Sequence, residues 1–204
     1  MRAKLLLLFV IVPVIIFGID VSDILKSSAN LKTVSCHIRA ENHSLRKVSV
    51  VEFDFYFKRP EKMRIDYTSP KSMRGSFIAV DGKYFYNYVA SLKRKMKKRI
   101  TGTKNPGKDL GVFFDYIVGD LDKALKGVDV SLVGSEKIEV NSKKIETFHF
   151  RFVKGDIGQE VWFDSKNLFP VKIEIYFKGK LKSRFVVWNL SINVDIDDGL
   201  FSPW

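Results

Sequence analysis

Apolar and polar residues alternate along most of the chain from position 33 onward. In segment 51–58 the odd positions are apolar and the even ones mostly polar, which is typical of a strand with one buried face. The period continues in 63–67, and Phe148, Phe150 and Phe152 form another alternating stripe. We therefore expect about eleven strands, at 33 onward, 51–58, 63–67, 77–81, 84–89, 93–101, 128–138, 143–153, 159–163, 171–177 and 181–192.

Helical spacing is confined to short segments. The first, 21–31, follows Asp20 and ends where the strand pattern begins at position 33; either Asp20 or Ser22 can cap its N-terminus. A second helix is expected at 110–118 and a third at 120–125, ended by a glycine at 127. The apolar residues that give the second helix its period are Leu110, Phe113, Phe114, Ile117 and Val118.

Short connections between consecutive strands predict a mostly antiparallel sheet, either curled around a core or closed into a barrel. Asp81-Gly82 suits the tight type I′ turn of a hairpin between two of these strands. Neither a Pro-rich linker nor an internal repeat divides the sequence after position 18. We expect a mainly β fold with two or three helices, and one domain over 19–204.

The first 18 residues have the organisation of a secretory signal peptide. Arg2 and Lys4 precede an apolar run over 5–17 that is short for a membrane span, and Gly18 precedes polar sequence. The alternative is an uncleaved anchor, because Ile16 is large for the position two before a cleavage site. We expect the signal peptide to export the chain to the periplasm.

Positive charge is concentrated in one run. The chain carries 35 basic and 23 acidic residues, and removal of Arg2 and Lys4 with the signal leaves a net charge of +10. Six cations occupy seven positions: Lys93, Arg94, Lys95, Lys97, Lys98 and Arg99. Because an exported protein rarely meets nucleic acid, anionic lipid headgroups, envelope polymers or acidic proteins are the expected contacts. The alternative is a solvated edge strand whose lysines discourage pairing with other strands.

The chain has 17 Phe, 7 Tyr and 3 Trp, more aromatic surface than a small core requires. One interpretation is a well-filled core between a curved sheet and helix 110–118. The other is a cavity for an apolar ligand with that helix as its lid. The lining residues would be Phe53, Phe55, Phe57, Ile65 and the stripe Phe148, Phe150 and Phe152.

Arg59 continues the inward parity of the strand at 51–58. Strand geometry directs its guanidinium to the side of the three phenylalanines, just before Pro60 interrupts the ladder. A buried guanidinium needs acceptors, and carbonyls at a loop or at a helix C-terminus would serve. The alternative is that the strand ends one residue early and Arg59 extends outward to solvent.

The cysteine, histidines and clustered aspartates of the sequence do not form a pattern typical of an enzyme active site. Cys36 is a lone cysteine typical of a buried apolar position. His37 and His43 flank an expected hairpin and are expected at the surface, and with His149 they lack the spacing of a zinc site. The cluster Asp195, Asp197 and Asp198 is better explained as solvated carboxylates in a turn. We expect neither an enzyme, nor a metal, nor a cofactor.

The segments FKRPEKMRIDYTSP at 57–70, AVDGK at 79–83, YFYNY at 84–88 and IDDGLF at 196–201 resemble the signature of the periplasmic lipoprotein-carrier family, LolA. The resemblance implies an unclosed, strongly curved antiparallel barrel of about eleven strands with helices as a lid over an apolar cavity. It also implies that Arg59 bonds lid-loop carbonyls and keeps the empty cavity closed, and that Met63 lies near the cavity mouth.

The resemblance further implies a carrier that binds the acyl chains of lipoproteins and transfers them from the inner to the outer membrane without bond chemistry. Its partners would be an inner-membrane exporter and an outer-membrane acceptor, and we expect a monomer. Two alternatives keep the fold: a carrier or sensor of free lipids or glycolipids, and an envelope-stress regulator that binds a partner protein.

Overall fold

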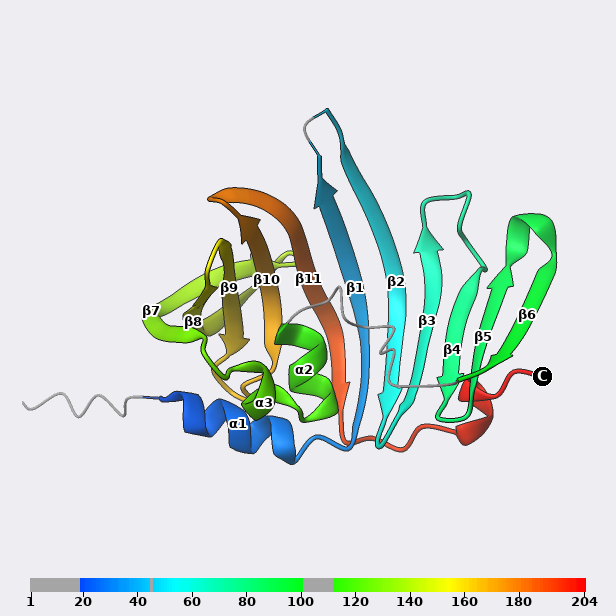
Figure 1. The fold of residues 1–204 in the computed structure, drawn as a ribbon, viewed down its shortest axis with the longest axis horizontal. Helices are drawn as coiled ribbons and strands as arrows, with labels where there is room; N and C mark the ends of the chain where they lie inside the picture. Colours follow the sequence, from blue (N-terminus) through cyan, green and yellow to red (C-terminus); the bar gives the residue numbers. More distant parts are fainter. Residues whose placement is uncertain (1–18, 45, 101–111) are drawn as a thin grey trace, which may run out of the picture.

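The computed structural model describes residues 19–44, 46–100 and 112–204. Within these residues the chain forms eleven strands and three α-helices (Figure 1). The helices are α1 (Val21–Ala29), α2 (Val112–Val118) and α3 (Leu121–Ala124), and the 3-10 turns η1 (Ala90–Leu92) and η3 (Asp198–Phe201) precede β6 and the C-terminus. The strands are β1 (Thr33–His43), β2 (Val48–Lys58), β3 (Lys62–Ser69), β4 (Phe77–Asp81), β5 (Tyr84–Val89), β6 (Arg94–Arg99), β7 (Asp129–Val140), β8 (Lys143–Lys154), β9 (Ile157–Asp164), β10 (Pro170–Phe177) and β11 (Lys180–Ile192).

All eleven described strands belong to one antiparallel sheet. Their order is β6-β5-β4-β3-β2-β1-β11-β10-β9-β8-β7, so each half of the chain is a meander and the β1–β11 pair joins the two. Strands β6 and β7 are the two ends of this order, and the sheet is therefore not closed. The predicted fold class, an unclosed antiparallel barrel with short helices, is confirmed.

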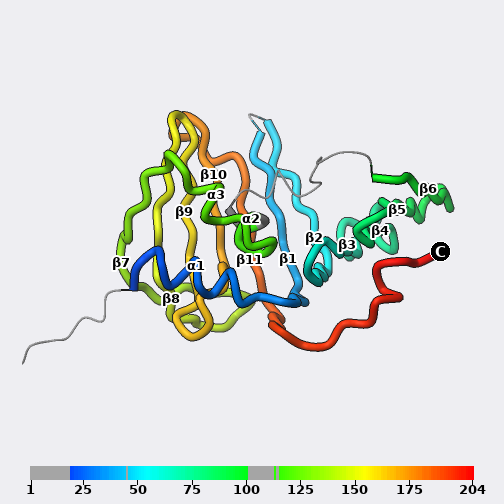
Figure 2. The backbone as a smooth tube through the Cα atoms, turned by 60° about the horizontal axis from the view of Figure 1, so that its bottom comes forward, coloured from blue at the N-terminus to red at the C-terminus, as the bar shows by residue number. Residues whose placement is uncertain are grey.

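The helices lie on one face of the curved sheet. They cover the region of β8 to β11 and β1, while β3 to β6 extend beyond them (Figures 1 and 2). Alternate residues of β1, among them Cys36 and Ile38, are buried in the same cluster as Ile24 of α1 and Phe113 of α2. This concave, helix-bearing face is the dry face that the period-two pattern predicts.

Helix α1 begins where the sequence predicts. The side chain of Asp20 accepts hydrogen bonds from the backbone N–H groups of Ser22 and Asp23, and the side chain of Asp23 accepts one from the backbone N–H of Asp20. This reciprocal arrangement is a capping box, which satisfies N–H groups that have no partner within the helix. The helix ends at Ala29, two residues before the predicted end, with Asn30 as its C-cap.

Two further local predictions differ from the structure. The hairpin at Asp81-Gly82 is present, but only Gly82 has a positive φ, so the turn is not type I′. The Asp81 carboxylate instead accepts the backbone N–H groups of Lys83 and Tyr84, which fixes the turn through a side chain. Strand β6 begins at Arg94 because Lys93 adopts a left-handed φ of 48°.

Two other predictions concern residues outside the described ranges. The signal peptide at 1–18 and Leu110 at the start of the second predicted helix both lie there. Among the helices that the structure describes, none has the length and apolar character needed to span a membrane.

Candidate functional site

Arg59 joins the sheet to the end of α1. Strand β2 ends at Lys58, and the guanidinium of Arg59 then reaches the helical side of the sheet. Its Nη2 donates to the carbonyl of Ser28 at 2.6 Å and its Nη1 to the carbonyl of Ala29 at 3.0 Å. The last carbonyls of a helix lack partners within the helix and carry the negative end of its dipole, so they suit a cation.

The end of α2 packs against the same guanidinium. Gly119 follows α2 with a φ of +81°, and a Cβ built on it would lie 2.5 Å from Nη2 of Arg59. Any side chain at this position would displace the arginine. Burial lowers the pKa of Arg59, and its Nε is buried without a hydrogen-bond partner in the described part of the chain. We call the contacts of Arg59 with Ser28, Ala29 and Gly119 the Arg59 latch.

A second set of polar contacts holds α1 and α2 together. The hydroxyl of Ser28 donates to the backbone carbonyl of Tyr116 at 2.6 Å, and the hydroxyls of Ser27 and Tyr116 lie 2.8 Å apart. Tyr116 is fully buried, and burial raises the pKa of its hydroxyl to about 12. Its ring packs edge-on against Phe169, so one residue anchors α2 to both the helix and the core.

The residues predicted to line a cavity belong to the hydrophobic core below the helices. Six of the eight are buried: Phe53, Phe55, Phe57, Met63, Phe150 and Phe152. Ile65 and Phe148 are partly buried and pack against the same cluster. Met63 of β3 is buried in this core, and its place at the mouth of a cavity stays a prediction.

The predicted lid residues that the structure describes pack against the sheet. The ring of Phe113 meets that of Phe55 edge-on, with centroids 6.0 Å apart, and Ile117 is fully buried. Phe114 lies in α2, although its side chain is outside the described part, as is all of Leu110. Helix α2 therefore presents apolar side chains to the very strand that leads to Arg59.

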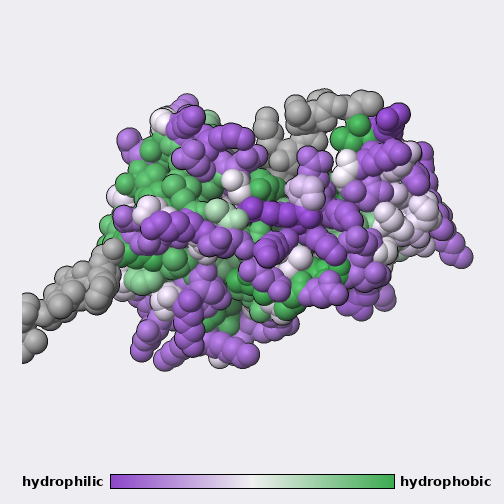
Figure 3. Space-filling model, turned by 90° about the horizontal axis from the view of Figure 1, so that it is seen from below, coloured by the Kyte–Doolittle hydropathy of each residue, from purple (hydrophilic) through white to green (hydrophobic). Residues whose placement is uncertain are grey.

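Apolar residues at two margins of the helical layer are only partly buried. On the side of β2 to β5 they are Val51, Ile65, Tyr67 and Phe85, and on the side of α1, α3, β7 and β8 they are Val21, Leu25, Leu125, Val130 and Phe148. Figure 3 shows apolar surface beside α1, on the side where β7 and β8 lie. Exposed apolar surface next to a core is where an apolar ligand can first make contact.

The basic run forms an edge of the sheet. All six residues of β6 are exposed, and Lys93 stands in the turn before it. Lys97 lies over the ring of Tyr84, with Nζ 4.5 Å from the centroid, and Lys95 lies 4.9 Å over Trp204. Cation–π contacts of this kind contribute modestly at exposed sites. Both the anionic-surface interpretation and the edge-protection interpretation fit this position.

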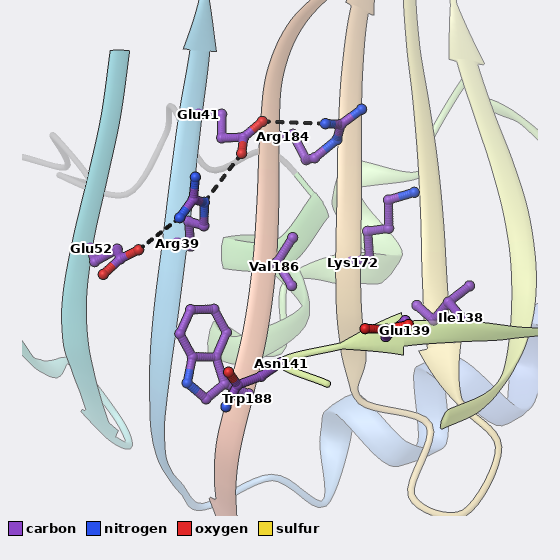
Figure 4. A pocket seen from close by; sticks show the side chains of 10 residues that line it. All are labelled: Arg39, Glu41, Glu52, Ile138, Glu139, Asn141, Lys172, Arg184, Val186 and Trp188. Carbon is purple, nitrogen blue, oxygen red and sulfur yellow. Dashed lines mark hydrogen bonds and ion pairs between the residues drawn. The ribbon is translucent and has the colours of Figure 1, made fainter. Parts of the chain in front are cut away.

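The convex face, opposite the helices, carries a polar pocket of about 780 Å³ (Figure 4). A chain of ion pairs crosses it from Glu52 to Arg39, Glu41 and Arg184. The end of β7 and the turn after it supply one wall. Its lining residues are Arg39, Glu41, Glu52, Ile138, Glu139, Asn141, Lys172, Arg184, Val186 and Trp188. Three cations face three carboxylates, so the pocket offers little net charge to an ionic ligand.

Glu174 joins this convex network through Lys172 and Arg184, two of the residues that line the pocket. Only 6% of it is exposed, and burial by itself would raise its pKa. Hydrogen bonds from Tyr176, Arg184 and Lys172 outweigh that effect, so the pKa of Glu174 is lowered. The carboxylate therefore stays charged inside a fully partnered network, as a buried ion requires.

The residues considered for enzyme chemistry have structural partners. Asp198 pairs with Lys58 at 2.8 Å and with Lys62 at 2.9 Å, which holds η3 against the sheet. In the described ranges, no group of three His, Cys, Asp or Glu residues is placed to hold a metal ion. Cys36 is buried, which raises the pKa of its thiol.

The expectation that His37 lies at the surface is wrong. Its ring packs 4.6 Å from that of Trp188, and its Nδ1 lies 2.7 Å from a carboxylate oxygen of Asp54. The side chain is 16% exposed. Its partners come from the neighbouring strands β2 and β11. The pairing of β1 with β11 joins segments that lie far apart along the chain, so the sequence around His37 does not reveal these partners.

Sequence reasoning missed three members of the helix contacts: Ser28, Tyr116 and Gly119. Gly119 carries a usable signal, because a glycine directly after a helical period commonly ends a helix with positive φ. Ser28 and Tyr116 carry none, since their bond joins residues 88 positions apart. Such a contact depends on how two helices cross, which neither segment encodes by itself.

The sequence matches neither a protein-family model nor a curated protein. Solved structures do match the fold. An uncharacterised conserved protein from Thermus thermophilus shares 12% identity over 90% of this chain and 93% of its own, with a TM-score of 0.57. The lipoprotein LppX from Mycobacterium tuberculosis shares 14% over 87% of this chain and 100% of its own, with a TM-score of 0.51.

MucB is also similar, with 15% identity over 88% of this chain and 61% of its own length and a TM-score of 0.56. A complex of MucA and MucB from Pseudomonas aeruginosa matches with a TM-score of 0.51. The similar structures include a LolA superfamily protein from Nitrosomonas europaea, with 14% identity over 90% of this chain and 98% of its own and a TM-score of 0.40. At these identities the likeness is one of fold, and this chain shares that fold with LppX and MucB.

Proposed function

We propose that the chain is an exported carrier that holds the acyl chains of a lipoprotein, or of a free lipid, between the concave face of its sheet and the three helices. The observation that carries the proposal is the Arg59 latch. Short helices cover an apolar sheet face, and one arginine holds the end of α1 through replaceable backbone acceptors and packs against the end of α2.

The magnitudes favour opening by a ligand. Each hydrogen bond from a charged donor contributes about 1.5–3 kcal/mol, so the two bonds of Arg59 contribute a few kcal/mol. Burial of an acyl chain contributes about 0.8 kcal/mol per CH₂, or about 8 kcal/mol for ten of them. An entering chain can therefore offset the loss of the latch, whereas the empty protein remains closed.

Transfer then needs an acceptor and not a chemical reaction. Acyl chains from the inner membrane would displace the helices and contact the phenylalanines of β2 and β8. Reformation of the latch would favour their release to an outer-membrane acceptor. MucB, which is solved in complex with MucA, shares the fold and supports a binding role.

The test is to purify the exported protein from its natural host under gentle conditions, extract it with organic solvent and identify the bound molecules by mass spectrometry. A lipid-modified polypeptide is expected for the lipoprotein carrier, and a free lipid or glycolipid for the second form of the proposal. A stoichiometric protein partner with no lipid would contradict both and favour a regulatory role instead. A mock purification from cells lacking the gene is the control.

A further inference from the structure

Strand β6 carries cations on both faces of the sheet. In the β5–β6 register Phe85 lies opposite Lys98, and directly opposite residues of an antiparallel pair share a face. Arg94 is four residues from Lys98 and therefore shares that face too. Phe85 lies opposite Val80, and Val80 opposite Met63, which is a core residue. Arg94 and Lys98 thus stand on the concave face, in continuation of the core.

The cations of the convex face have partners. Lys97 donates to the backbone carbonyl of Trp204 at 3.2 Å and lies over the rings of Tyr84 and Tyr86. Lys95 lies over the ring of Trp204. These side chains pack on aromatic residues of β5 and of the C-terminal segment, and this packing explains their presence without a ligand.

The concave cations differ. Both Arg94 and Lys98 are exposed, and in the part of the chain that the structure describes neither makes an ion pair or a cation–π contact. Met96 lies between them on the same face and is 42% exposed. Two cations flanking an exposed apolar side chain at the edge of an apolar face form an amphiphilic rim.

The apolar face leads from the helical layer to this rim. Helix α2 meets the sheet at Phe55 of β2. Beyond it, Ile65 of β3 and Phe85 of β5 are only partly buried, and Lys98 follows on β6. An acyl chain lying across these strands would place its polar end at Arg94 and Lys98.

From this arrangement we infer that the carried amphiphile has an anionic headgroup, which Arg94 and Lys98 bind on the concave side of β6. The inference rests on the proposed function and specifies its ligand: an acyl chain for the apolar strands and a net negative charge for the rim. Basic residues near an anionic lipid surface contribute enough for about a fivefold preference each. The preference should weaken as salt screens these exposed cations.

The test uses short-chain lipids below their critical micelle concentration, so that no membrane surface is present. Dihexanoyl phosphatidylglycerol and dihexanoyl phosphatidylcholine have the same acyl chains and differ in net charge. Binding of each is measured by calorimetry to the full mature chain. The variant R94Q/K98Q is compared with K95Q/R99Q, which removes the same residue types at the same spacing from the convex face. Circular dichroism checks that both variants are folded.

We expect the wild-type chain to bind phosphatidylglycerol about 25-fold more tightly than phosphatidylcholine, about fivefold for each of the two cations. R94Q/K98Q should lose most of this preference, while K95Q/R99Q should keep it within about twofold. Equal affinity for both lipids, or an equal loss in both variants, would overturn the headgroup inference and leave the carrier proposal standing. Binding to phosphatidylglycerol vesicles without binding of monomeric phosphatidylglycerol would also overturn it. The cations would then bind a membrane surface and not the headgroup of a carried lipid. Failure of both lipid monomers to bind would count against the carrier proposal itself.

Discussion

Arg59 lies one residue beyond the end of β2, where its side chain is free of the ladder and its guanidinium can turn toward α1. Its two terminal nitrogens both donate to carbonyls at the end of that helix. The planar guanidinium presents these donors in a fixed fork, which a lysine lacks. The residue therefore stabilises the closed arrangement of helices and sheet without being part of the apolar interface.

Replacement of Arg59 by leucine should favour the loaded state. The closed, empty form loses the latch while the loaded form loses little, so the equilibrium shifts toward bound lipid. Loss of even one of the two hydrogen bonds costs the closed form about 1.5–3 kcal/mol, so we expect a lipid bound by Arg59→Leu to dissociate at least about tenfold more slowly. Transfer of a fluorescent fatty-acid probe to acceptor vesicles measures this rate. Arg59→Lys, which keeps the charge, should lie between; a wild-type release rate in Arg59→Leu would disprove the latch.

Gly119 and Gly127 provide a matched pair for the packing of the latch. Both have positive φ, but a Cβ at Gly127 meets no atom within 4 Å, whereas one at Gly119 meets Arg59. The left-handed conformation alone costs an alanine about 1 kcal/mol. Gly127→Ala should therefore lower the free energy of unfolding by about 1 kcal/mol, and Gly119→Ala by about 3 kcal/mol because it also disrupts a hydrogen bond of Arg59. Urea unfolding measures both, and equal losses would contradict the close contact.

At the scale of elements, the helical layer is held by polar contacts between short helices. Helix α2 has seven residues, too few to be stable in isolation, so its position depends on α1 and the sheet. The hydrogen bond from the Ser28 hydroxyl to the Tyr116 carbonyl is buried, so each of these two groups has the other as a partner in place of water. This bond joins the end of α1 and α2 into one packed unit.

Ser28→Ala should loosen that unit. Loss of a buried hydrogen bond leaves the Tyr116 carbonyl unpartnered and should cost about 1–3 kcal/mol. Hydrogen exchange followed by mass spectrometry should show faster exchange in α1 and α2, with β9 and β10 unchanged. Ser22→Ala is the control, because Ser22 lies at the other end of α1, away from α2. Equal protection of the helices in wild type and Ser28→Ala would contradict the coupling.

At the scale of the whole molecule, the two halves of the sheet meet where β1 pairs with β11. On the convex face this junction is crossed by the bonds of Arg184 to Glu41 of β1 and Glu174 of β10. On the concave face the phenylalanines of β2 and β8 share one core with the helices. The junction thus combines an apolar and an ionic layer, and the ionic layer makes it sensitive to acid.

Stability should fall in acid as Glu174 is protonated. The pKa of Glu174 is lowered in the folded chain from its ordinary value of 4.5, despite its burial, by hydrogen bonds from Tyr176, Arg184 and Lys172. Its stabilisation is therefore fully present above pH 4.5 and is lost as the pH falls through the lower folded value. Glu174→Gln should cost about 3 kcal/mol at pH 7, since it leaves cations unpaired. Urea unfolding between pH 3 and pH 7 should show a shallower pH dependence for this variant, and parallel curves would refute the assignment.

Much of the fold could be predicted because its signals are local. The period of two depends on successive side chains pointing to opposite faces, so each strand reveals its dry side by itself. The capping residue Asp20 and the hairpin at Gly82 are local as well. The predicted turn type at Asp81 was wrong because its carboxylate, and not the backbone alone, satisfies the nearby N–H groups.

The sequence by itself determined the strands, their meandering order and the side of the sheet toward which Arg59 points, since all three follow from spacing along a single segment. Only the tertiary structure decided which carbonyls accept from Arg59, that Gly119 touches it, and that Phe55 packs against Phe113. It likewise separated Arg94 and Lys98 from the other cations of the basic run, because their surroundings depend on the neighbouring strand and on the C-terminal segment. Contacts between distant segments depend on curvature and packing, which local periodicity does not encode.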